Sequence, residues 1–130
     1  MLKLWLTLPI LLAACLKDET ASGRADPRAV YALREWNAQA FSGTATISFP
    51  EPGRIAGDAP CNRFFANLTV PYPWFAIDRI GTTRRACPES QTENAFFKAL
   101  RSASLVEVSG PVLILSNDEG LQMVFRAGQD

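Results

Sequence analysis

Few residues of this chain could carry chemistry. Its 130 residues contain three cysteines and no histidine. The usual general base, the Ser-His and Cys-His pairs and the commonest zinc ligand are therefore missing. Asp58, Asp78, Glu89 and Asp118 could supply a glycosidase-like carboxylate pair, which would need a defined separation in space. No motif joins any two of them, so we expect no catalytic residue, no cofactor and no metal site, with an enzyme as a remote alternative.

The first cysteine, Cys15, ends a segment with the features of an export signal. Lys3 is followed by a mostly apolar run at residues 4–12. That run is too short for a membrane-spanning helix, which needs about 20 residues, but it suits a secretory signal. The sequence Leu-Ala-Ala-Cys that ends at Cys15 resembles the lipobox of bacterial lipoproteins. The resemblance implies removal of residues 1–14 as a signal peptide and attachment of diacylglycerol to the Cys15 sulfur.

Lipidation at Cys15 would fix the location of the protein. Each buried methylene contributes about 0.8 kcal/mol, and stable anchoring takes more than one acyl chain. We therefore expect the membrane to be a partner through the lipid on Cys15. Leu16 follows in place of the aspartate that favours the inner membrane of enteric bacteria. The sequence thus predicts a protein of the bacterial cell envelope, in the outer membrane facing the periplasm. An ordinary secretory signal with an accidental cysteine is the alternative.

The two remaining cysteines, Cys61 and Cys87, form an even pair in an exported domain. In an oxidising compartment such a pair favours a disulfide. The alternative is a reactive or metal-binding thiol pair, but there is no Cys-x-x-Cys motif and no histidine to support it. Asn62, next in the chain, could offer its amide to a ligand, although asparagine more commonly satisfies the backbone of a turn.

Two groups of residues are candidates for surface contacts. Arg79, Arg84 and Arg85 form a basic cluster that could bind lipid phosphate or a carboxylate, because arginine binds both in a bidentate way. A solvated surface is the alternative for these arginines. Tyr72 and Trp74 belong to a dense aromatic stretch that could be an exposed contact site or a plug of the core.

Composition indicates one globular domain. Hydrophobic residues make up 48% of the chain and charged residues 20%, and 13 basic residues balance 13 acidic ones. A nucleic-acid-binding protein usually has a basic excess, so we expect no nucleic acid as a partner. Residues 15–28 are polar and lack hydrophobic periodicity, which predicts a lipidated cysteine followed by a flexible tether. Residues 29–130 then form the folded domain.

Patterns of alternating and continuous apolar residues predict several short strands. We expect strands at residues 31–36, 44–49, 54–58, 64–70, 74–80, 105–108, 112–115 and 121–125. For the first of these, a helix over residues 27–39 is the alternative. The continuous apolar run at 112–115 predicts cover on both faces of that strand. Short connections between the last three strands predict an antiparallel meander.

One helix is expected at residues 88–102. Ser90 and Glu93 have the spacing of a capping box, in which both side chains satisfy free backbone donors. One face of this helix is apolar, because its large residues recur at three- and four-residue spacing. These residues are Phe96, Phe97, Leu100 and Ala103.

Three segments together resemble the META domain (HslJ-like) family. The segment 57–62, which ends in Cys-Asn, resembles that family's Gly-x-x-Gly-Cys-Asn motif, and 83–87 resembles its Thr-x-x-Ala-Cys motif. The helix at 93–100 and the last strands also match in order, so the similarity covers about residues 29–127. Departures include Ala38, where a glycine is usual in the family.

The resemblance implies an α+β fold, mainly an antiparallel and barrel-like β meander, with one amphipathic helix packed on the sheet. It also implies an envelope location and roles in stress, including tolerance of certain antibiotics, without an established enzymatic activity or cofactor. We therefore expect a non-enzymatic envelope lipoprotein with a structural or binding role and possible protein or lipid partners. The rival hypothesis is a lipoprotein inhibitor of an envelope hydrolase such as lysozyme, in which an exposed loop would plug the active-site cleft.

Overall fold

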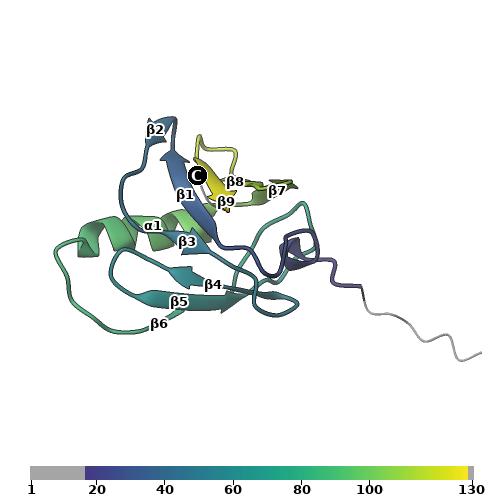
Figure 1. Ribbon diagram of the computed structural model, residues 1–130, viewed down its shortest axis with the longest axis horizontal. Helices are drawn as coiled ribbons and strands as arrows, with labels where there is room; N and C mark the ends of the chain where they lie inside the picture. The colour runs from purple at the N-terminus through teal and green to yellow at the C-terminus, as the bar shows by residue number, and fades with distance from the viewer. Residues whose placement is uncertain (1–16, 129–130) are drawn as a thin grey trace, which may run out of the picture.

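The computed structural model describes residues 17–128, which form two antiparallel sheets and one α-helix (Figure 1). The predicted signal peptide, Cys15 and Leu16 lie outside the described residues. The strands are β1 (Tyr31–Trp36), β2 (Gln39–Ala40), β3 (Thr46–Ile47), β4 (Arg54–Asp58), β5 (Arg63–Asn67), β6 (Gly81–Thr82), β7 (Leu105–Ser109), β8 (Val112–Ser116) and β9 (Gln122–Ala127). The helices are the 3-10 turn η1 (Ala21–Gly23) and α1 (Ser90–Ser102). No helix among residues 17–128 is long and apolar enough to cross a membrane.

The predicted α+β class, mainly antiparallel with one helix, is confirmed, but the sheets do not close into a barrel. The larger sheet has the order β2-β1-β9-β8-β7, with β3 also paired to β1, and the smaller sheet has the order β4-β5-β6. The sheets meet where Ser48 forms a single bridge with Ala56. The edge strand β7 also contacts the irregular segment between β5 and β6, because the Val106 amide donates to the Pro73 carbonyl at 2.8 Å. The meander of β7, β8 and β9 is present as predicted.

The helix α1 fills the space between the two sheets. Its predicted apolar face is buried, with Phe96 and Leu100 fully shielded from solvent. The Phe96 ring lies 6.4 Å from the Trp36 ring of the larger sheet and 5.7 Å from the Phe64 ring of the smaller one. The core is therefore built around aromatic rings that the helix brings to both sheets.

Some strand predictions were wrong. The segment 74–80 is not a strand, and its ladder contacts are the isolated bridges of Trp74 with Leu105 and of Ile77 with Leu68. Two prolines, Pro71 and Pro73, precede it and cannot donate to a ladder.

Two other strands differ in extent or cover. Around β3, Ala45, Ile47 and Phe49 are buried as the alternation predicted, although the strand itself is limited to Thr46–Ile47. In β8, Leu113 and Leu115 are buried while Val112 and Ile114 are half-buried. One face of β8 is thus fully covered, and the prediction of cover on both faces was wrong.

The capping box predicted for the helix is absent. Glu89 is the N-cap residue of α1, and no side chain caps the first turn. The Glu93 carboxylate faces the turn between β4 and β5, where it finds more donors than the first turn of the helix offers.

The predicted flexible tether is also wrong for the residues that the structure describes. Ala21 is 1% exposed and belongs to the hydrophobic core, and Ser22 is buried. The Tyr72 amide donates to the Glu19 carbonyl at 2.6 Å. The segment from Asp18 to Ala25 is therefore packed on the domain.

Candidate functional site

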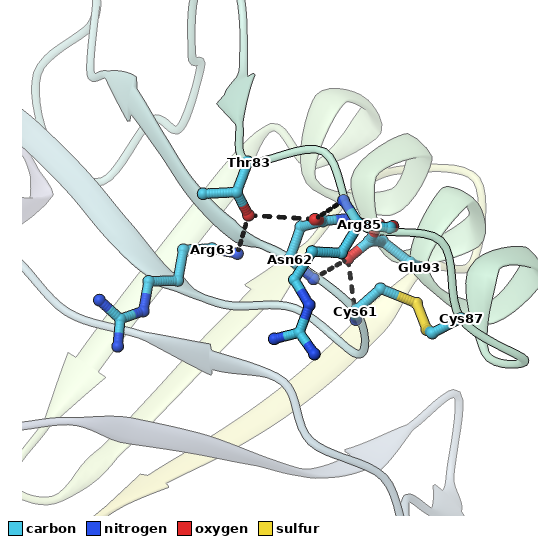
Figure 2. The surroundings of a disulfide bond; sticks show 7 residues. All are labelled: Cys61, Asn62, Arg63, Thr83, Arg85, Cys87 and Glu93. Atoms are coloured by element: carbon cyan, nitrogen blue, oxygen red, sulfur yellow. Dashed lines mark hydrogen bonds between the residues drawn. A yellow bond between two sulfur atoms is a disulfide. The ribbon is translucent and has the colours of Figure 1, made fainter.

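A disulfide joins Cys61, in the turn between β4 and β5, to Cys87, in the loop before α1 (Figure 2). The two Cα atoms lie 5.9 Å apart. The Glu89 carboxylate lies close enough to both sulfurs for the three groups to hold a metal ion. Sulfurs bonded to each other are not thiolates, however, and thiolates are the form that binds metals. The geometry thus favours the predicted disulfide over the thiol alternative.

Glu93 lies beside this disulfide in Figure 2 and is 6% exposed. Its Oε1 accepts hydrogen bonds from the amides of Cys61 at 3.0 Å and Asn62 at 2.7 Å. Its Oε2 accepts a bond from Asn62 Nδ2 at 2.7 Å. A buried carboxylate held by three donors is a structural brace of the turn, because both of its oxygens are occupied.

Asn62 connects the turn to the loop that carries Cys87. Its Oδ1 accepts bonds from the Arg85 amide at 2.6 Å and the Thr83 hydroxyl at 3.0 Å. Its Nδ2 also donates to the Arg85 carbonyl at 3.1 Å. The buried side-chain amide of Asn62 therefore satisfies backbone groups, as predicted, rather than facing a ligand. The backbone that it satisfies lies in a distant loop and not in its own turn. We call Cys61, Asn62, Thr83, Cys87 and Glu93 the disulfide brace.

Two arginines at the edge of the disulfide brace remain available to solvent. The Arg63 side chain is 85% exposed and forms a loose ion pair with Asp58 at 3.6 Å. Figure 2 shows the guanidinium groups of Arg63 and Arg85 turned away from Glu93. Both residues line a surface hollow together with Asp58 and Asn62. Exposed guanidinium groups suit a carboxylate or phosphate partner.

Sequence reasoning missed Arg63. The available signal was its position on β5, where Phe64 and Ala66 are buried and their neighbours, Arg63 included, are exposed. The structure also separates the arginines that the sequence grouped. Arg85 binds Asn62 before the start of β5, whereas Arg79 follows Asp78, which is bonded to Asn67 at the end of β5. Arg84 lies next to Arg85 and is exposed.

The aromatic candidates lie elsewhere. Tyr72 is half-buried and its hydroxyl accepts a bond from the Val108 amide at 3.2 Å. Trp74 is 58% exposed, whereas Phe75 is 3% exposed. The stretch is therefore part core and part surface, since Phe75 fills the core and Trp74 reaches solvent.

The four candidate carboxylates do not share a hollow. Asp58 lies beside Arg63, and Glu89 lines a separate hollow with Phe41. Asp118 lies in the exposed turn between β8 and β9. Asp78 accepts two bonds from Asn67, both at 2.8 Å, and these hydrogen bonds lower its pKa.

Comparison with known families and structures identifies relatives of this fold. A family model described as the META domain matches residues 27–130. An NMR structure of a protein from Burkholderia xenovorans is 21% identical, with a TM-score of 0.64 over 85% of this chain and 88% of that one. Another protein solved by NMR is 19% identical, with a TM-score of 0.61 over 77% of this chain and 89% of the other.

A third solved structure has a similar fold. The crystal structure of a DUF4847 family protein from Bacteroides vulgatus is 19% identical, with a TM-score of 0.54 over 65% of this chain and 60% of that one. At these identities the likeness concerns the fold. A search of curated proteins found no match.

Proposed function

Because this chain belongs to the META domain family, we propose that it is a non-enzymatic lipoprotein of the bacterial cell envelope that maintains envelope integrity by binding a partner. The observation that carries the proposal is the disulfide brace. Its buried carboxylate and amide are saturated by internal hydrogen bonds, so they support the fold while the arginines beside them face solvent.

The disulfide supports an extracytoplasmic location. Disulfides persist in oxidising compartments such as the periplasm and are rare in the cytoplasm. Cys61 and Cys87 are bonded here, and Cys15 stands in the lipobox-like sequence. An oxidised domain and a lipid-anchoring sequence are consistent with the periplasmic side of a membrane, and Leu16 favours the outer membrane.

The exposed arginines support a binding role. Arg63 and Arg85 come from different segments, and Asn62 fixes the backbone of the loop that carries Arg85. Rigid positioning lowers the entropy cost of binding an anionic group. We therefore assign partner contact to the surface formed by Arg63, Arg84 and Arg85.

Labelled palmitate tests the anchor. The full chain should incorporate the label, and Cys15→Ser should not. Globomycin should leave an unprocessed precursor. A chain that reaches the envelope without palmitate would overturn the lipoprotein assignment.

Cross-linking in intact cells tests the binding role. We expect one discrete adduct that Arg63→Ala combined with Arg85→Ala removes. The matched control is Arg101→Ala combined with Arg126→Ala, which removes the same charge from exposed positions elsewhere. An adduct lost equally in both variants would contradict the assigned surface. A lysozyme assay with the same variants checks the rival hypothesis, since inhibition that depends on Arg63 and Arg85 would identify an inhibitor.

A further inference from the structure

The end of the molecule that carries η1 has an exposed tryptophan, Trp74, that is not part of the proposed partner-binding surface. We propose that this end rests on the bilayer surface, with Trp74 inserted among the lipid headgroups. The inference rests on the proposed lipidation of Cys15. Figure 1 shows η1 at one end of the molecule and the loop that leads into α1 at the other.

The chain near Cys15 is fixed to the domain. The hydroxyls of Thr20 and Ser22 both donate to the Asp18 carboxylate, and Ser22 Oγ accepts a bond from the Gly53 amide at 2.8 Å. A side chain at Gly23 would collide with the Asp18 carbonyl, since its Cβ would lie 2.1 Å from that oxygen. This close packing leaves no flexible linker between residue 18 and the core.

Because of this packing, only a short stretch of chain separates Cys15 from the folded domain. Cys15 precedes Lys17 by two residues, and two extended residues span about 7 Å. The headgroup region on each side of a bilayer is about 5–8 Å thick. Lipid on Cys15 would therefore hold Lys17, and the end of the domain that carries it, at the depth of the headgroups.

Trp74 is placed to use this position. It closes a turn in which its amide donates to the Pro71 carbonyl at 2.9 Å, and the same turn contacts Glu19 through the Tyr72 amide. Among the large apolar side chains most exposed in the described part of the chain, Trp74 has the highest exposure at 58%. Tryptophan favours the membrane interface, because its ring is apolar and its indole N–H is polar.

Charges beside Tyr72, two residues before Trp74 in the same turn, also suit a headgroup layer. The Arg24 guanidinium lies 5.0 Å from the centre of the Tyr72 ring. Lys17, Glu19, Arg24 and Tyr72 line one hollow together with Asp18, whose carboxylate is engaged by Thr20 and Ser22. The ammonium group of Lys17 and the guanidinium group of Arg24 suit the phosphates of zwitterionic and anionic lipids. The exposed Glu19 carboxylate suits the amine of a zwitterionic headgroup. The disulfide brace at the opposite end then faces away from the membrane.

Fluorescence quenching by brominated lipids tests this contact. The lipidated protein is purified from membranes and reconstituted in vesicles of phosphatidylethanolamine and phosphatidylglycerol, with or without bromine on the acyl chains. Without residues 1–14 its tryptophans are Trp36 and Trp74. We expect bromine to quench the wild-type emission and to leave the Trp74→Phe variant, which keeps only the half-buried Trp36, unquenched.

The outcomes separate the two proposals. Mass spectrometry first establishes whether Cys15 carries acyl chains, and an unlipidated protein would overturn the proposed function together with this inference. If the acyl chains are present and wild type and Trp74→Phe are quenched to the same fraction, or neither is quenched, the bilayer contact is wrong and the lipoprotein assignment stands. Thermal unfolding of Trp74→Phe confirms that the exposed substitution leaves the fold intact.

Discussion

Glu93 shows how one side chain can serve a different purpose from the one its local sequence indicates. Its spacing from Ser90 matches a capping box, but its carboxylate accepts bonds from the amides of Cys61 and Asn62, which lie 32 and 31 residues earlier in the chain. Those amides sit in a tight turn where no strand partner is available to them. A buried carboxylate with three donors is worth more than a cap at an exposed helix end, so the tertiary contact wins.

Removing this carboxylate should therefore destabilise the whole domain. We expect Glu93→Ala to lower the free energy of unfolding by about 3 kcal/mol, because three donors, two of them in buried hydrogen bonds, lose their acceptor. Glu89→Ala is the matched control, since Glu89 is exposed and caps nothing with its side chain. Its effect should stay below about 1 kcal/mol. Urea denaturation measures both, and equal losses would show that charge at the helix start, rather than the brace, matters.

At the scale of elements, the hairpin between β1 and β2 contains a strained position. Asn37 and Ala38 have φ angles of 49° and 66°, the left-handed region that a two-residue hairpin turn requires. Asparagine tolerates this conformation, and Asn37 Oδ1 also accepts a bond from the Gln122 amide. Alanine does not tolerate it well, and the META family's usual glycine at this position has a clear physical reason.

Ala38→Gly should therefore stabilise the protein. Relief of the left-handed strain gains about 1–2 kcal/mol, and the extra entropy of glycine in the unfolded chain offsets about half of it. The expected net gain is about 0.5–1 kcal/mol in urea denaturation. Ala40→Gly, two residues later in β2 and also exposed, should lower stability by a similar amount. A loss from both substitutions would contradict the strain at Ala38.

The segment that carries η1 depends on an ionised Asp18. Burial alone would raise the pKa of this carboxyl, but hydrogen bonds from Ser22 and Thr20 outweigh burial and lower the pKa below its ordinary value of 3.8. A lowered pKa in the folded state means that the stabilisation is complete above pH 3.8 and is lost as the pH falls through the folded value.

Acid should accordingly release this segment before the rest of the domain. We expect the protection factor of the Gly53 amide, which donates to Ser22 Oγ, to fall as the pH drops below 3.8. Asp18→Asn should show the low protection at every pH. Asp78→Asn is the control, because the pKa of Asp78 is also lowered but its partner is Asn67. A pH dependence that survives in Asp18→Asn would assign the effect to another group.

For the whole molecule, local patterns predicted the elements better than their contacts. Alternation identified the last strand, and the apolar stripe of α1 identified the face that is buried. Contacts between distant segments left no local signal. The polar sequence around Ala21 suggested a tether because its anchoring bonds come from Gly53 and Tyr72, which are far away in the chain. Arg85 was predicted as a contact residue, but its proximity to Arg63 was not, because these two residues come from distant segments.

The disulfide is the long-range contact that sequence did predict, and its energetic role can be stated for the whole fold. Cys61 and Cys87 are 26 residues apart, and closing a loop of that length in the unfolded chain stabilises the native state by about 3–4 kcal/mol in the chain-entropy model. The free energy of unfolding of a protein is typically about 5–15 kcal/mol, so the disulfide contributes a large part of the stability but not all of it.

We therefore expect Cys61→Ser combined with Cys87→Ser to remain folded and to lose about 3–4 kcal/mol in urea denaturation. The fold should persist because Asn62 and Glu93 still join the β4–β5 turn to α1 and to the Arg85 loop by hydrogen bonds. Ser42→Ala, an exposed substitution outside this loop, is the control and should leave stability unchanged. An unfolded double variant would contradict this prediction. It would show that the hydrogen bonds of the disulfide brace form only when the covalent bond holds the two loops together.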